Sequence, residues 1–282
     1  MRTALDCYPC LVRQSLDASR MVSDDPAVHE QVVREMLAWT AQAGPNESPP
    51  ALGQRLHRRL REVTGVGDAY RAEKDRHNRM VMRLLPELRE RIEAAADPFG
   101  LAVTLAIAGN IIDLGVASEY DLEASIARVL KQPFAIDHLE RMRSALGGAR
   151  EILYLADNAG ETVLDRLLIE FLEPPVTYVV KGGPAVNDAT REDAVAAGLG
   201  EVCEIIDNGA ATLGTLLDLC SPEMKRRFEA ADLIIAKGMA NYESLSGTRA
   251  GLYFLLQAKC AVIAEHLDVP DRSILVMEDR PG

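Results

Sequence analysis

The second half of the chain alternates short apolar runs with helical patterns, and this alternation restricts the possible folds more than any other feature. Segments with helical spacing, such as Thr162–Leu172 and Thr190–Ala197, separate most of the runs. Continuous apolar strands separated by helices are typical of a parallel sheet covered on both faces. The sequence therefore predicts a Rossmann-like α/β/α sandwich with a mostly parallel sheet over residues 149–282. The predicted strands are Glu151–Ala156, Val176–Lys181, Glu201–Ile206, Asp232–Ala236, Tyr253–Ala258 and Ser273–Met277.

The first half has a different pattern, in which apolar residues recur at three- and four-residue spacing. This pattern predicts helices over Cys10–Val22, Pro26–Gln42 and Pro50–Thr64, followed by a long charged helix over Asp68–Ala95. No strand-like run occurs before Glu151. The sequence thus predicts a helical region over residues 1–148, placed before an α/β region that carries most of the functional site.

Composition and charge exclude several classes of protein. Hydrophobic residues make up 48% of the 282 residues and charged residues 26%, a balance typical of globular proteins. The formal net charge of −12 disfavours nucleic acid and anionic membranes as partners, because both carry negative charge. The longest apolar stretch, Leu101–Ala117, is interrupted by polar residues, and the amino terminus lacks a signal-peptide pattern. Together with five mostly scattered cysteines, these features predict a cytoplasmic protein.

Polar and charged residues directly follow four of the predicted strands. The carboxyl ends of parallel strands meet at one edge of a sheet, and ligands bind there. Carboxylate and amide oxygens are the ligands that Mg²⁺ and Mn²⁺ prefer, and both cations take further ligands from substrate phosphate. The sequence therefore predicts a site for a divalent cation at this edge. The residues after the four strands are Asp157, Asn158 and Glu161; Lys181 and Asp188; Asp207 and Asn208; and Lys237 and Asn241.

Each of these residues, taken alone, also has a simpler explanation. Asp157 or Asn158 could cap the helix that begins near Thr162, and Asp188 could cap Thr190–Ala197. Residues with oxygen ligands, and lysines, recur after four predicted strands, and this recurrence favours the cation site over helix capping. Other chemistries lack their motifs: the chain has no P-loop, no G-x-G-x-x-G after the first strand, no paired aspartates of the haloacid-dehalogenase type, and no histidine at a predicted strand end.

The order and spacing of the motifs make the chain resemble the metal-dependent damage-control phosphatases, the DUF89 family, which is related to the protein called acidic residue methyltransferase. The resemblance covers nearly the whole chain, and it is closest to the short prokaryotic branch with an N-terminal Cys-x-x-Cys. The segments that carry it are Asp6–Cys10, Lys74 with Asn78, Gly109–Asp113, Asp157–Glu161, Lys181–Asp188 and Lys237–Glu243.

The resemblance implies an activity and a set of site residues. The activity is hydrolysis of phosphate esters of small metabolites, such as sugar phosphates, with one divalent cation: Mn²⁺, Mg²⁺, Co²⁺ or Ni²⁺. Asp157, Asn158 and Asp188 would bind the cation, and Asp157, Asp188 and Lys237 would act in catalysis, with Lys237 near the phosphate. The implied substrate-binding residues are Asn110, Asp113, Glu161, Lys181, Asn241, Lys74 and Asn78.

Two other functions and one motif stay open. The chain could bind a metal and a phosphorylated metabolite without turnover, or it could be a carboxyl methyltransferase, although it lacks the glycine-rich first loop expected for a nucleoside cofactor. Cys7 and Cys10 supply only two of the four ligands of a structural zinc. They could serve structure, an accessory metal or redox control.

Overall fold

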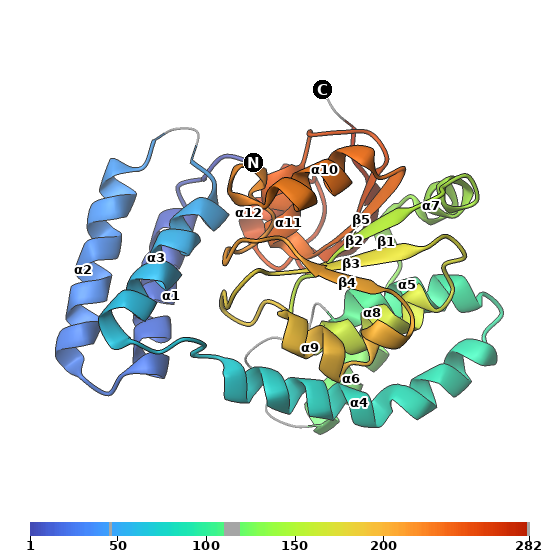
Figure 1. The fold of residues 1–282 in the computed structure, drawn as a ribbon, viewed down its shortest axis with the longest axis horizontal. Coiled ribbons are helices and arrows are strands. Elements are labelled where there is room, and N and C mark those ends of the chain that lie inside the picture. Colours follow the sequence, from blue (N-terminus) through green and yellow to red (C-terminus); the bar gives the residue numbers. More distant parts are fainter. Residues whose placement is uncertain (45–46, 110–118, 281–282) are drawn as a thin grey trace.

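The computed structural model describes residues 1–44, 47–109 and 119–280 (Figure 1). Its helices are α1 (Cys7–Val22), α2 (Pro26–Gln42), α3 (Pro49–Thr64), α4 (Arg71–Glu93), α5 (Pro98–Gly109), α6 (Glu119–Val129), α7 (Leu139–Leu146), α8 (Glu161–Ile169), α9 (Arg191–Ala196), α10 (Pro222–Ala230), α11 (Gly238–Leu245) and α12 (Ala261–His266), with two 3-10 turns, η1 (Leu199–Glu201) and η2 (Leu217–Leu219). Its strands are β1 (Phe134–Asp137), β2 (Ile152–Leu155), β3 (Val176–Val180), β4 (Glu204–Asp207), β5 (Leu233–Lys237), β6 (Leu252–Gln257) and β7 (Ile274–Glu278).

The strands form one sheet in the order β1-β7-β6-β5-β2-β3-β4. The five strands from β6 to β4 in this order are mutually parallel. The strand β7 runs antiparallel to β6, and β1 runs parallel to β7. The predicted mostly parallel α/β sandwich is therefore confirmed, and each of the six predicted strands overlaps a real one.

One strand lies where the sequence showed none. The strand β1 pairs with β7 at the edge of the sheet, so the expectation that no strand precedes Glu151 is wrong. Its four residues alternate between half-buried and exposed, whereas those of β2 are all buried. An edge strand that is covered only in part needs no continuous apolar run, and a four-residue alternation is too short to stand out.

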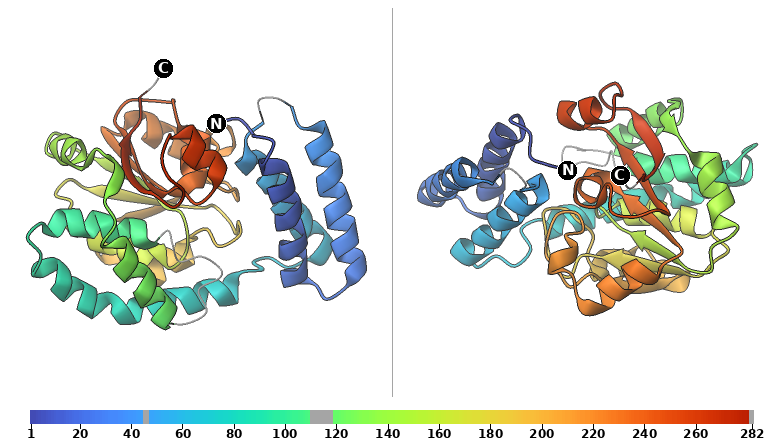
Figure 2. Two further views of the ribbon diagram at one scale, coloured as in Figure 1. Left: turned by 180° about the vertical axis from the view of Figure 1, so that it is seen from behind. Right: turned by 90° about the horizontal axis from the view of Figure 1, so that it is seen from above.

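Helices cover the two faces of the sheet, as Figures 1 and 2 show, and each face has its own core. Ile152, Tyr154 and Tyr178 point to the face packed by α4, α5, α8 and α9. Leu153 and Leu155, one position along β2, point to the face packed by α10, α11 and α12. This alternation is the period of two expected for a strand buried on both faces.

The first three helices form a separate bundle around a core of their own, which includes Leu11, Met36 and Leu56. The helices from α4 onward share their core with the sheet, so the hydrophobic cores separate near residues 65–70. Figure 2 shows the bundle standing beside the α/β body. Within the described residues, no helix combines the length and apolar character that a membrane crossing requires.

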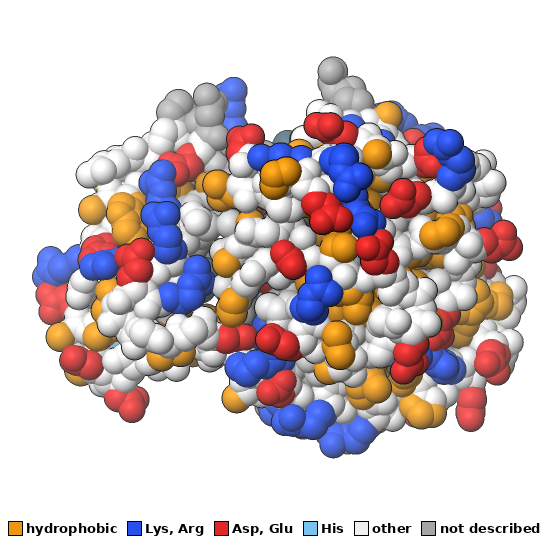
Figure 3. Space-filling model, in the orientation of Figure 1, with side chains coloured by type: hydrophobic (Ala, Val, Ile, Leu, Met, Phe, Trp, Pro, Cys, Tyr) orange, Lys and Arg blue, Asp and Glu red, His pale blue; other side chains and the backbone are white. Residues whose placement is uncertain are grey.

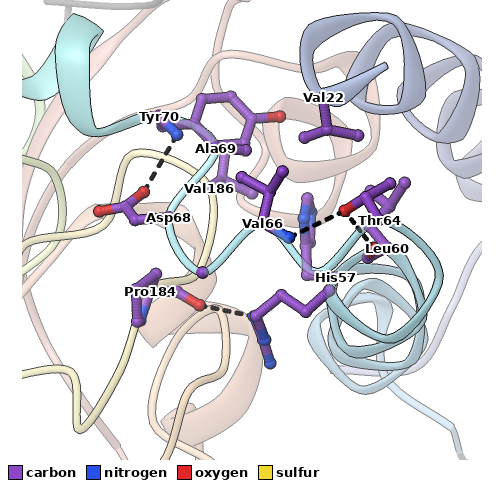
Figure 4. A pocket seen from close by; sticks show the side chains of 12 residues that line it. Val22, His57, Leu60, Thr64, Val66, Asp68, Ala69, Tyr70, Pro184 and Val186 are labelled. Atoms are coloured by element: carbon purple, nitrogen blue, oxygen red, sulfur yellow. Dashed lines mark hydrogen bonds between the residues drawn. The ribbon is translucent and has the colours of Figure 1, made fainter.

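The bundle meets the α/β body at a small cavity, shown in Figure 4, with about 20 Å³ of room for water. His57, Tyr70 and Val186 line it, and the side chain of Arg61 donates a hydrogen bond to the Pro184 carbonyl, at 2.8 Å. The bundle thereby contacts the loop that follows β3. On the face drawn in Figure 3, acidic and basic side chains are interspersed.

Candidate active site

The candidate site lies where the chain changes direction within the sheet. From β2 the chain continues to β3 and β4 on one side, then crosses to β5 and β6 on the other. Ligands of open α/β sheets bind at such a point, outside the carboxyl ends of the two strands. Here Asp157 follows β2 and Gly238 follows β5, and a Cβ built on Gly238 would lie 1.8 Å from Asp157 Oδ2. The Asp157 carboxylate therefore rests directly against the Gly238 backbone.

Backbone hydrogen bonds bring the second predicted segment beside the first. Asn158 and Asp188 form an isolated antiparallel bridge. The Ala189 amide donates to the Asp157 carbonyl, and the Ala159 amide donates to the Asn187 carbonyl, both at 2.8 Å. Asp157, Asn158 and Asp188 are all buried. The structure thus brings together three residues that lie up to 31 positions apart in the sequence.

None of these three residues caps a helix. The helix α8 is capped by Gly160, with no side-chain cap hydrogen bond. The helix α9 is capped by Thr190, which forms a capping box with Asp193. The simpler explanation therefore fails for Asp157, Asn158 and Asp188, since other residues occupy the cap positions.

The two aspartates are in an environment that disfavours their negative charge. Burial and the neighbouring Glu161 and Asp188 raise the pKa of Asp157 well above its usual value. Burial also raises the pKa of Asp188 to about 6, although Lys181 opposes the shift. Asp188 Oδ2 is buried and accepts no hydrogen bond, and it lies 3.3 Å from Lys181 Nζ. A cation bound here would satisfy these oxygens.

The donor set fits a hard cation. Asp157 and Asp188 offer carboxylate oxygens, and Asn158 offers an amide oxygen, all of which suit Mg²⁺ or Mn²⁺. No three His, Cys, Asp or Glu side chains among the described residues are already grouped to hold a metal. Only two of the three predicted ligands, Asp157 and Asp188, are residues of these types. Water molecules and substrate oxygens would complete the coordination shell of the cation.

Two lysines add positive charge at the same edge of the sheet. Lys181 is buried and donates to the Gly214 carbonyl, at 2.7 Å. Lys259 follows β6 and is partly exposed, and its charge is close enough to lower the pKa of Asp157 against the larger effect of burial. Lys259 was not among the predicted residues, although it follows the fifth parallel strand just as the predicted residues follow the other four.

Lys237 does not lie as predicted. Its ammonium group is fully buried and donates to the Ala106 carbonyl at 2.8 Å, to Glu161 Oε2 at 3.1 Å and to Asp165 Oδ1 at 2.6 Å. These three bonds use all three ammonium hydrogens. Burial by itself would lower the pKa of Lys237, but the charges of Asp165 and Glu161 raise it. Lys237 therefore has no free donor for a phosphate.

Three other residues predicted to bind substrate also have internal partners. Asn241 donates to the carbonyls of Ala156 and Lys237, at 3.1 and 2.7 Å, and accepts from Thr215. Asn78 and Lys74, both buried in α4, contact Asp193, at 2.9 and 3.0 Å. Asn78 also accepts from the Gly160 amide, at 2.6 Å. These side chains therefore do not form an open binding surface. Their contacts hold in place the loops that carry the site.

Two predicted site residues and the Cys-x-x-Cys motif remain. Asn110 and Asp113 fall outside the described residues. Cys7 and Cys10 line a cavity of about 390 Å³ between the bundle and the body, together with Cys260 and Glu243. Burial raises the pKa of the Cys7 thiol, which disfavours the reactive thiolate.

Comparison with known proteins gives one consistent result. The family described as "Damage-control phosphatase ARMT1-like domain" matches residues 3–275. A damage-control phosphatase of Archaeoglobus fulgidus is 36% identical over 273 residues, which cover 93% of this chain and 94% of that protein. A damage-control phosphatase of Pyrococcus horikoshii is 32% identical and covers 99% of both chains. The crystal structure of a DUF89 family protein from the same organism superimposes with a TM-score of 0.91 at 31% identity, covering 99% of this chain and 100% of the other.

The family predicted from the motifs is therefore confirmed, while the assignment to the Cys-x-x-Cys branch stays a prediction. With a family match over nearly its entire length and two relatives above 30% identity, the chain belongs to the family of ARMT1-like damage-control phosphatases.

Proposed function

We propose that this phosphatase is a metal-dependent phosphomonoesterase, which hydrolyses phosphate esters of small metabolites such as sugar phosphates at the carboxyl edge of the sheet, beside β2 and β5. The names of its relatives indicate the class of reaction. The buried residues at this edge support the metal dependence and the choice of a phosphate ester.

The observation that carries the proposal is an excess of buried negative charge. Four carboxylates are buried in and next to the candidate site, those of Asp157, Glu161, Asp165 and Asp188, against the two buried ammonium groups of Lys181 and Lys237. Buried charge is costly unless it is compensated. The excess of two negative charges matches one divalent cation. Lys74 adds nothing to this balance, because it pairs with Asp193 and Asp68.

The residues of the chain would divide the work as follows. Asp157, Asn158 and Asp188 hold the cation, which when bound supplies a Lewis acid and lowers the pKa of a water. Lys259, partly exposed at the rim, attracts the dianionic phosphate and orients it. One of the two aspartates accepts the proton of the attacking water or attacks phosphorus itself.

The test is phosphate release from a panel of sugar phosphates and an aryl phosphate, before and after chelation. EDTA should abolish turnover, and Mn²⁺ or Mg²⁺ should restore it, with bound metal measured in each sample. Asp157→Asn should remove activity, while Asp232→Asn should not. Asp232 is a suitable control because the charge change is the same and it lies at the amino end of β5, where it pairs with Arg150.

Full turnover in excess EDTA, with no metal in the protein, would refute the metal dependence. Tight binding of Mn²⁺ and of a phosphorylated metabolite without phosphate release would favour a binding protein. Binding of a methyl-donor cofactor in calorimetry would favour the methyltransferase. The panel therefore separates all three functions.

A further inference from the structure

The carboxylate of Glu161 links the candidate metal ligands to the buried core. Glu161 is the first residue of α8, and its side chain is fully buried. Its Oε1 accepts a hydrogen bond from Asn158 Nδ2 at 2.7 Å, and its Oε2 accepts from Lys237 Nζ at 3.1 Å. Both oxygens therefore already accept a hydrogen bond from a neighbouring side chain.

The amide of Asn158 is oriented by two carboxylates. Its Nδ2 donates to Glu161 and also to Asp157 Oδ2, at 3.1 Å. Ionised carboxylates only accept hydrogen bonds, so they require the amide nitrogen, and not the amide oxygen, on their side. With its nitrogen on the side of both carboxylates, Asn158 has Oδ1 as the end of the amide that neither carboxylate holds. This is the orientation that a metal ligand needs, because only the oxygen can bind the cation.

Asp165 holds the other end of this chain of contacts. It lies one turn after Glu161 in α8 and is fully buried. It accepts hydrogen bonds from Lys237 Nζ at 2.6 Å, and from the hydroxyls of Tyr154 and Tyr178, each at 2.7 Å. The two tyrosine rings stack with their centroids 5.4 Å apart. Asp165 is therefore fixed from three directions, and it fixes Lys237 in turn.

We propose that Glu161, Lys237 and Asp165 are positioning residues, which turn the amide of Asn158 so that its oxygen is presented to the metal. Asp165 and Lys237 keep Glu161 in place and compensate its charge, and Glu161 holds the amide nitrogen. The inference rests on the proposed function, since it requires a metal at Asn158. It assigns Glu161 and Lys237 roles other than contact with the substrate, and it brings in Asp165, which no motif indicated.

The geometry predicts what an isosteric change at Glu161 would do. In Glu161→Gln, Lys237 still requires an acceptor, so the glutamine oxygen must face it. The glutamine nitrogen then faces Asn158, whose amide has to turn its oxygen toward the glutamine and its nitrogen toward the metal. Adding Asn158→Asp should correct this when the cation is bound, because a carboxylate offers an oxygen on both sides and the cation compensates the approach of its charge to Asp157 Oδ2. The double variant also has the same net charge as the wild type.

The test measures Mn²⁺ affinity by calorimetry and the melting temperature of the metal-free protein. Outer contacts of this kind typically change metal affinity about 10- to 100-fold. Glu161→Gln and Asp165→Asn should therefore weaken Mn²⁺ binding by about tenfold or more. The double variant Glu161→Gln with Asn158→Asp should regain most of that loss. The matched control is Tyr178→Phe, which removes one bond to Asp165 but no charge. It should lower the melting temperature and leave Mn²⁺ affinity within about twofold, because Tyr154 and Lys237 still hold Asp165.

Folded Glu161→Gln and Asp165→Asn proteins with wild-type Mn²⁺ affinity would overturn the proposal and leave these residues a purely structural role. A double variant that binds no better than Glu161→Gln would overturn it as well, because the loss would then not arise from the orientation of the amide. If one single variant fails to fold, the other decides the matter. Failure of the wild-type protein to bind any divalent cation would instead refute the proposed function, and this inference with it.

Discussion

Gly238 offers a direct test of whether Asp157 acts at a fixed position. The residue has φ +76°, and a Cβ there would lie 1.8 Å from Asp157 Oδ2. In Gly238→Ala, the carboxylate must move by about 1.2 Å to reach 3.0 Å, the lower limit of real contacts. Metal sites must be held to within about 0.5 Å, and a 1 Å displacement at an active site can cost about a hundredfold in rate. We therefore expect Gly238→Ala to lower the rate on an aryl phosphate about a hundredfold, and to weaken Mn²⁺ binding.

The matched control is Gly247→Ala. Gly247 has φ +79°, but no atom lies within 4 Å of its added Cβ. Both substitutions therefore carry the same backbone strain, about 1 to 2 kcal/mol of lost unfolding free energy, and only Gly238→Ala displaces Asp157. Urea unfolding in EDTA measures the strain, and kinetics with Mn²⁺ calorimetry measure the displacement. Equal, near-wild-type rates in the two variants would show that Asp157 can move without loss of activity, and would contradict a fixed position for its carboxylate.

Three further results are expected. Asp188→Asn should not lower the melting temperature of the metal-free protein, because Asp188 caps no helix and burial disfavours its negative charge. It should lower Mn²⁺ affinity or turnover about a hundredfold, and an unchanged rate would exclude Asp188 as a ligand. The double variant Cys7→Ser with Cys10→Ser should keep most of its turnover on an aryl phosphate, and a thousandfold loss with the fold intact would place these cysteines in the chemistry. Burial lowers the pKa of His57 to about 4, so between pH 6.5 and pH 4 the unfolded state binds a proton at His57 and the folded state does not. The free energy of unfolding should therefore fall by about 3 kcal/mol as the pH falls through this window. Urea unfolding at several pH values measures this dependence, and His57→Gln should remove the part that His57 contributes.

Local sequence patterns predicted the class of fold and the edge of the sheet at which the candidate ligands lie. Strands such as β2 and β3 are buried on both faces, so their whole length is apolar and easily recognised. Residues that directly follow such a strand must lie at the carboxyl edge of the sheet, whatever the strand order. Asp157 and Asn158 could therefore be assigned to this edge from local patterns alone, whereas Asp188 follows β3 only after a loop, which backbone hydrogen bonds hold against Asp157 and Ala159. The edge strand β1 lacked that signal, because only part of it is covered.

The roles of the two buried lysines, Lys181 and Lys237, and of their acidic partners follow only from the tertiary structure. The side chain of a lysine at the end of a strand can lie at the carboxyl edge of the sheet or turn into the core, and the neighbouring sequence does not distinguish the two. Lys181 contacts Asp188 at the edge, whereas Lys237 turns inward to Asp165. The direction follows from a partner 72 positions away, on a helix whose place is set by packing against the sheet. Side-chain direction depends on such long-range contacts, because a buried charge must find its counter-charge wherever the fold has placed it.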